Sequence, residues 1–198
     1  LLASLSQTVL STALPTIVGA LDGADHILWV ITAYLLSSTI MMPIQGRLSD
    51  QFGRKPILLS AVFVFTVGSF FGAIATSMPI LIIARVVQGL GGGGLMVLSQ
   101  AAIADVVPAR ERGKYMGFIG VAFAFSSVVG PLLGGWFTEG PGWRWAFWIN
   151  VPLGIVAFAV TAVLLKKPPR RSEPTRPDYL GMMLLACVTT SLVLGVTW

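Results

Sequence analysis

The sequence predicts an all-α protein that crosses a lipid bilayer several times. Charged residues make up only 11% of the chain and apolar residues 55%, whereas soluble domains carry roughly a quarter charged residues. The mean hydropathy is +0.84. Together with long runs that hold no charge, this composition excludes water as the main solvent of the chain.

Seven apolar runs are each long enough to cross the membrane as a helix, which takes about 20 residues. The runs are continuous and rich in Leu, Ala and Gly, unlike the short alternating strands of an outer-membrane barrel. Helices satisfy their own backbone hydrogen bonds in lipid. The predicted spans are residues 1–19, 28–45, 56–76, 79–104, 115–137, 145–165 and 179–198.

The runs divide the chain into three expected parts. Residues 1–165 form a six-helix transmembrane bundle, residues 166–178 a proline-rich, charged linker, and residues 179–198 a seventh transmembrane helix. The chain starts without Met inside an apolar stretch and stops at the end of a span. We therefore expect it to be the N-terminal portion of a longer protein.

The basic residues predict the orientation of the spans. All Lys and Arg residues except Arg85 and Arg144 lie in the loops after spans two, four and six. The positive-inside rule places these loops and the N-terminus in the cytoplasm. The basic loops face anionic lipid, and we exclude nucleic acid as a partner. Tryptophans near the predicted outer ends are typical of an aromatic belt. They are Trp29, Trp136, Trp143 and Trp145.

The loop between spans two and three has the specific pattern Gly-x-Leu-x-Asp-x-x-Gly-Arg-Lys, with Gly46, Asp50, Gly53, Arg54 and Lys55. Its glycines allow a tight turn, and Asp50 and Arg54 place opposite charges about one helical turn apart. The loop resembles the signature loop of the major facilitator superfamily, in which it forms a cytoplasmic gate. The alternative is a turn that carries only orienting charges. Acids contribute little to orientation, so Asp50 favours the gate.

Asp105, at the inner end of span four, resembles the acid that joins this charge cluster in the family. The alternative role is a solvated boundary residue beside Arg110 and Glu111, and the sequence does not separate the two.

Arg85 is the only charge inside any predicted span. A cation at mid-helix costs about 2.5 to 3.5 kcal/mol on insertion scales, so such residues usually face a cavity or a partner. Arg85, Gln88 and Gly89 resemble the Arg-x-x-Gln-Gly motif that the family uses in proton coupling. The alternative is that Arg85, six residues after Pro79, snorkels to the outer surface.

Span five is rich in glycine around a proline that favours a kink. It resembles the Gly-Pro-x-x-Gly-Gly element of the family's drug antiporters, although close helix packing alone also explains glycines at four-residue spacing. The residues of this antiporter helix are Gly120, Gly130, Pro131, Gly134 and Gly135.

One segment narrows the resemblance to a single branch of the family. It reads Trp143-Arg144-Trp145-x-Phe147-x-x-Asn150 and continues to Pro152 and Gly154. It is similar to the entrance of span six in the fourteen-helix drug:proton antiporters, where an extra helix pair joins the two halves. The linker and seventh span fit that branch, so the resemblance covers essentially the whole chain.

Span one carries a polar stripe that we expect to face a central cavity, with interhelical hydrogen bonding as the alternative. The candidate cavity residues are Ser4, Ser6, Thr8 and Ser11. Ser6 stands where that branch usually has Asp, and no Asp or Glu lies within a span. A serine does not exchange a proton at physiological pH. If transport is coupled to protons, a proton-binding group must come from the absent half, or the coupling differs, or this chain is impaired.

The resemblance implies a multidrug exporter of the bacterial inner membrane that works by proton antiport and alternating access. Its expected partners are protons, a small lipophilic or cationic substrate, and the missing C-terminal half of the transporter. The alternatives are an importer or facilitator of a small solute, or a truncated half that is inactive alone. The spans hold no catalytic constellation, and His26 and Cys187 are single residues of their kind, so we expect no enzyme activity, metal or cofactor.

Overall fold

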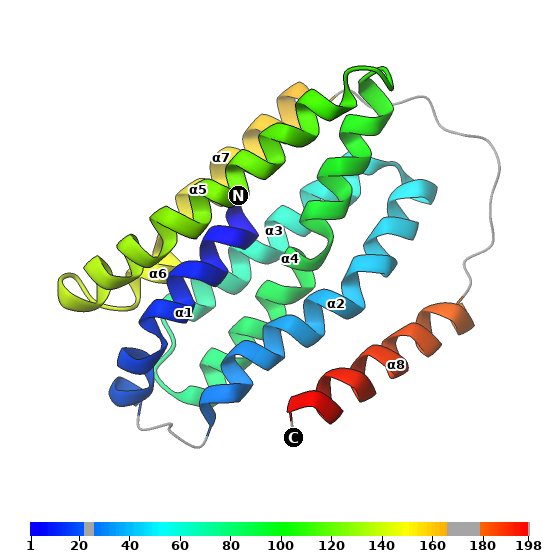
Figure 1. The fold of residues 1–198 in the computed structure, drawn as a ribbon. Coiled ribbons are helices and arrows are strands. Elements are labelled where there is room, and N and C mark those ends of the chain that lie inside the picture. The colour runs from blue at the N-terminus through cyan, green and yellow to red at the C-terminus, as the bar shows by residue number, and fades with distance from the viewer. Residues whose placement is uncertain (22–25, 166–178, 198) are drawn as a thin grey trace.

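The computed structural model describes residues 1–21, 26–165 and 179–197, which fold into a bundle of long helices with short connections (Figure 1). No strand occurs within these ranges. The helices are α1 (Leu2–Leu21), α2 (Ile27–Phe52), α3 (Arg54–Ala73), α4 (Met78–Val106), α5 (Arg112–Glu139), α6 (Trp145–Trp148), α7 (Asn150–Leu164) and α8 (Tyr179–Thr197).

The all-α polytopic membrane fold is confirmed. In the described part of the chain, six helical segments are long and apolar enough to cross a membrane, and they coincide with the first six predicted spans. The sixth segment, Trp145–Leu164, consists of α6 and α7. Pro152 has no backbone N–H to donate to the carbonyl of Trp148, which accounts for the irregular turn between the two helices.

The seventh predicted span forms a helix, α8, which contacts α2. The predicted linker, residues 166–178, and Trp198 lie outside the described residues.

The predicted loop between spans two and three is shorter than we expected. Helix α2 continues through Gly46 and Asp50 to Phe52, and only Gly53, with φ of +92°, separates it from α3. Since charged side chains at a helix end can reach water while the backbone stays helical, the loss of hydrophobicity does not mark the end of the helix. The tight turn therefore depends on Gly53 alone, because only glycine adopts this φ readily.

Helix α4 lies in the middle of the bundle and packs against α2 and α3 (Figure 1). Its glycines bring the backbones very close. A Cβ atom on Gly91 would meet the Cα of Phe65 in α3 at 2.8 Å, and one on Gly93 would meet the Cα of Ser38 in α2 at 2.7 Å. Real Cβ atoms do not come this close, so both positions require glycine.

Helix α5 is peripheral and packs mainly on α1. Only Ser126, Gly130, Gly134 and Phe137 are buried along its length. Its contact face therefore follows a three- to four-residue spacing, as expected for one side of a helix.

Replacing Gly91 with Ala should destabilise the protein by about 1–3 kcal/mol, because the new methyl group meets the backbone of α3 and overpacks the contact. Thermal unfolding of the purified protein in detergent measures the effect. The control is Gly117→Ala in α5, where an added Cβ has nothing within 4 Å; helix propensity should make it neutral or stabilising. Equal midpoints for the two variants would contradict the close α3–α4 contact.

Candidate functional site

Arg85 lies in the middle of the helix bundle, on α4, and its side chain is 0% exposed. The alternative that it snorkels to the outer surface is therefore wrong for this structure. It is the largest fully buried side chain in the described part of the chain.

The guanidinium of Arg85 is held by neutral groups from three helices. It donates hydrogen bonds to the carbonyl of Val30 (3.2 Å), the side-chain oxygen of Gln7 (2.7 Å) and the side-chain oxygen of Gln88. It also lies over the ring of Tyr34, 4.1 Å from the centroid, in a cation–π contact. Within the described residues, neither ion pair of the protein involves Arg85. Its charge is therefore stabilised by dipoles and a ring rather than by an acid.

Gln88 extends this arrangement to a fourth helix. Its amide nitrogen donates to the hydroxyls of Ser6 in α1 (3.0 Å) and Ser69 in α3 (2.8 Å), while its oxygen accepts from Arg85. We call Ser6, Gln7, Tyr34, Ser69, Arg85 and Gln88 the arginine network. These partners are hydroxyl, phenol and amide groups, so no side chain beside Arg85 is an acid that exchanges a proton near neutral pH.

Gly89 lies beside the arginine network and makes room for close helix packing through its small size. A Cβ at this position would meet the backbone oxygen of Tyr34 at 2.7 Å. The glycine therefore lets α4 approach α2 at the level of Arg85.

The four predicted cavity residues of α1 do not share one environment. Ser6 is 2% exposed and belongs to the arginine network. Thr8 donates to the carbonyl of Ser126 in α5 (3.0 Å), which is the interhelical bonding considered as the alternative. Ser11 is exposed and bonds to its own helix, and Ser4 is half-buried.

Arg54 contacts two acidic side chains at the end of the bundle where α2 and α4 finish. It pairs with both side-chain oxygens of Asp105 and, at 3.4 Å, with Asp50. Asp105 thus joins the predicted charge cluster. The side chains are 22% exposed for Arg54, 43% for Asp105 and 66% for Asp50. Partly exposed ion pairs contribute only about 0–1 kcal/mol, so this contact can open at little cost.

Lys55 and Gly46 have other surroundings. The Lys55 ammonium donates to the carbonyl of Ala162 in α7 (2.7 Å), so it fastens the start of α3 to the end of α7. Gly46 sits inside α2, and its carbonyl accepts from the hydroxyl of Ser49 (2.6 Å).

The antiporter helix residues of α5 fall into two groups. A Cβ on Gly130 or Gly134 would collide with Thr8 or Thr12 of α1, so these glycines allow close packing. Gly120 and Gly135 have nothing within 4 Å of the added atom. Pro131 lies on the exposed side of the helix.

Sequence reasoning missed three members of the arginine network. Gln7, Tyr34 and Ser69 are polar residues inside apolar runs, and that is the only signal they give. In the described ranges, no three His, Cys, Asp or Glu side chains come together in a way that could hold a metal ion.

Replacing Gln88 with Leu should destabilise the protein by about 1–3 kcal/mol. The change leaves Arg85 without one acceptor and the hydroxyls of Ser6 and Ser69 without their donor, and buried groups without partners carry a cost of this size. Gln100→Leu is the matched control on the same helix, because no hydrogen bond is described for Gln100. Thermal unfolding in detergent compares the two variants; a Gln88 variant as stable as the control would contradict the network.

The comparisons with known proteins agree with this architecture. The family model of the Major Facilitator Superfamily matches residues 1–195. An uncharacterised MFS-type transporter of Mycobacterium tuberculosis is 42% identical over 200 residues, covering 100% of this chain and 29% of that protein. Efflux pump FUS6 of Gibberella fujikuroi is 39% identical over 202 residues, covering 100% of this chain and 36% of the pump.

A solved structure gives the same fold. The human organic anion transporter MFSD10 superposes with a TM-score of 0.77 at 20% identity, over 93% of this chain and 50% of that one. This likeness concerns the fold alone. The chain spans 29–36% of the length of the two curated relatives. With the family model matching nearly every residue, the chain belongs to the Major Facilitator Superfamily of membrane transporters.

Proposed function

We propose that this chain is the N-terminal portion of an exporter that moves small lipophilic or cationic compounds by proton antiport. It belongs with the fourteen-helix drug antiporters and resides in the bacterial inner membrane. Export proceeds by alternating access, in which two halves rock about a site near the middle of the bilayer.

The observation that carries this proposal is the close contact between α1 and α5. Gly130 and Gly134 bring α5 against Thr8 and Thr12 of α1, while the rest of α5 is largely exposed. A helix attached along one narrow glycine face can shift against its neighbour. The 39% identity to a protein named as an efflux pump supports export as the direction.

The proton-binding group of this proposal lies outside the chain. The acids in its described helices, Asp50, Asp105 and Glu139, all stand near helix ends. Arg85 would act as a fixed positive charge whose field disfavours protonation of a nearby acid or occupancy by a cation. Ser6, in contact with Gln88, is the place where this chain lacks an acid.

The second candidate is an importer or facilitator of a small solute. The charge cluster of Arg54, Asp50 and Asp105 favours neither direction, because opening and closing one end of the bundle serves import and export equally.

In the complete protein, Arg85→Ala should lower proton-driven export of ethidium, a lipophilic cation, by about tenfold or more. The variant removes three hydrogen bonds made by a charged group, each worth about 1.5–3 kcal/mol. Ethidium fluorescence in proteoliposomes with an imposed proton gradient measures export. Unchanged proton-dependent export would remove Arg85 from the mechanism.

Three controls accompany this assay. A protonophore should abolish transport in the unaltered protein. Arg85→Lys, which keeps the charge but loses the guanidinium fork, should retain more activity than the alanine variant. The 198-residue chain alone should be inactive, since it supplies only one wall of a cavity. Accumulation of substrate in the direction opposite to export would favour the importer.

Labelling of single cysteines should show that the N-terminus is cytoplasmic. In a Cys187→Ser background, Glu139→Cys should react with a membrane-impermeant maleimide added to intact cells, and Arg110→Cys should react only after the membrane is opened. Both positions are exposed and lie at opposite ends of α5. The reverse pattern would overturn the orientation derived from the basic loops.

A further inference from the structure

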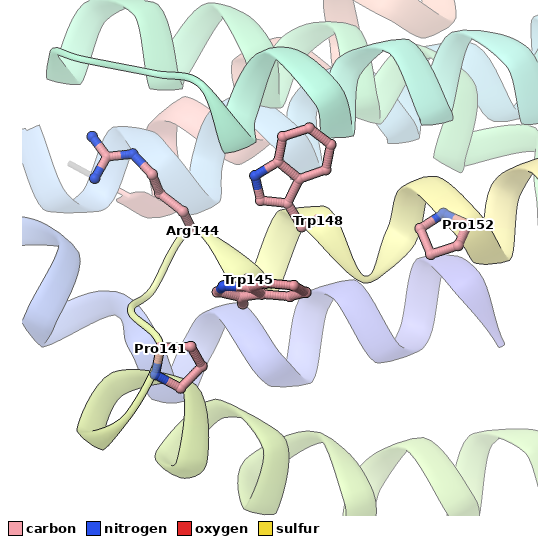
Figure 2. Close-up of a pocket in the computed structure, with 5 residues that line it drawn as sticks. All are labelled: Pro141, Arg144, Trp145, Trp148 and Pro152. Carbon is pink, nitrogen blue, oxygen red and sulfur yellow. The ribbon is translucent and has the colours of Figure 1, made fainter.

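A pocket lies at the end of the bundle opposite the charge cluster of Arg54. Pro141, Arg144, Trp145, Trp148 and Pro152 line it, and its volume is about 440 Å³. Figure 2 shows that the residues come from the connection after α5, from α6 and from the start of α7. We call it the tryptophan pocket.

The pocket adjoins an apolar surface that a bilayer would cover. Helix α7 contacts α3 and α1 on one side, and its only buried residues are Asn150 and Gly154. The side chains that α7 leaves exposed are apolar. They include Ile155, Val156, Phe158, Val160, Val163 and Leu164. A ligand in the pocket can therefore continue along α7 into the hydrocarbon.

Packing against α3 fixes one wall of the pocket. The indole of Trp148 packs edge-to-face on Phe70 of α3, with ring centroids 5.7 Å apart. The indole of Trp145 is half exposed. Tryptophans at this level are typical of the boundary between headgroups and acyl chains, and Arg144 stands one residue before the membrane span that begins at Trp145.

The guanidinium of Arg144 is held in place but keeps free donors. One nitrogen donates to the carbonyl of Ala75 (3.0 Å), and the group lies 4.6 Å from the ring centroid of Trp143. An arginine has five N–H donors, and the described residues accept only this one hydrogen bond from Arg144. Its charge is not paired with an acid in the described ranges.

We propose that the tryptophan pocket binds an anionic phospholipid from the leaflet at this end of the bundle. The free N–H groups of Arg144 bind the headgroup phosphate, and the two indoles and the prolines hold the upper part of an acyl chain. A guanidinium matches a phosphate well because two parallel N–H donors bind two oxygens. The inference does not depend on the direction of transport.

The charge of Arg144 favours an anion, and the apolar walls favour a lipid over a soluble anion. Arg144 is the one Lys or Arg in the sequence between spans one and two, three and four, and five and six, so a soluble phosphate would meet a single such cation. A phospholipid adds apolar contact with Trp145 and Trp148, and it is already concentrated in the plane of the membrane.

Quenching of tryptophan fluorescence by brominated lipids tests the proposal. The complete protein is placed in phosphatidylcholine nanodiscs with increasing amounts of acyl-brominated phosphatidylglycerol or, in parallel, acyl-brominated phosphatidylcholine. We expect the phosphatidylglycerol to bind about fivefold more tightly, because one Lys or Arg near the surface is worth about 1 kcal/mol toward an anionic lipid. Equal quenching by the two lipids would overturn the proposal.

Variants of Arg144 test whether the preference for phosphatidylglycerol arises at the tryptophan pocket. Arg144→Gln should abolish the preference for phosphatidylglycerol, and Arg144→Lys should restore part of it. Arg112→Gln, at the other end of the bundle, is the matched control and should keep the full preference. Because each variant is compared with itself in the two lipids, a general loss of stability does not mimic the result. A preference that persists in Arg144→Gln would refute the site.

Two further measurements separate the remaining explanations. Replacing both Trp145 and Trp148 with Phe should remove the extra quenching by phosphatidylglycerol; if that quenching persists, the lipid binds elsewhere and the proposal fails. Soluble glycerol 3-phosphate should not compete. Competition at the concentration of the lipid would identify a site for free phosphate and would also overturn the proposal.

Discussion

The buried guanidinium of Arg85 is the interaction on which the arrangement of the first four helices depends. Its direct partners come from α1, α2 and α4, and Gln88 adds α3 through Ser69. A charge at this depth without such partners would carry a large cost. The four helices must therefore keep one relative placement, because any shift that breaks a bond leaves a polar group unsatisfied in an apolar interior.

Such a network supplies a larger share of the forces between helices in a membrane than it would in a water-soluble protein. Lipid tails are as apolar as leucine, so burial of apolar side chains does little to hold transmembrane helices together. Close backbone contact and interhelical hydrogen bonds remain as the specific forces. Both concentrate on α4, where Gly91 and Gly93 bring α3 and α2 close around the same helix that carries Arg85.

The sequence was a good guide to the spans and a poor one to the contacts between them. Long runs with almost no charge predicted seven spans, and the first six coincide with helices that are long and apolar enough to cross a membrane, because the hydrocarbon admits little else. Arg85 could be predicted as a functional or structural centre because it is the only charge within a predicted span. Its partners could not be predicted, since Ser6 and Gln88 are 82 residues apart and many other polar side chains in the runs bond only to their own helix. The helix ends were also misplaced, because Asp50 keeps a helical backbone while its side chain reaches water.

Contact strength differs between the middle of the bundle and its ends, but all of these contacts join helices of the same half. Hydrogen bonds of the buried Arg85 hold the middle, whereas partly exposed ion pairs of Arg54, each worth about 0–1 kcal/mol, join α2, α3 and α4 at one end. Helix α5 lies at the edge of the bundle and contacts mainly α1. A half built in this way can rotate as a body about its middle, because both sets of contacts lie within it. Rocking about a site near the bilayer midplane then requires no rearrangement of the arginine network itself.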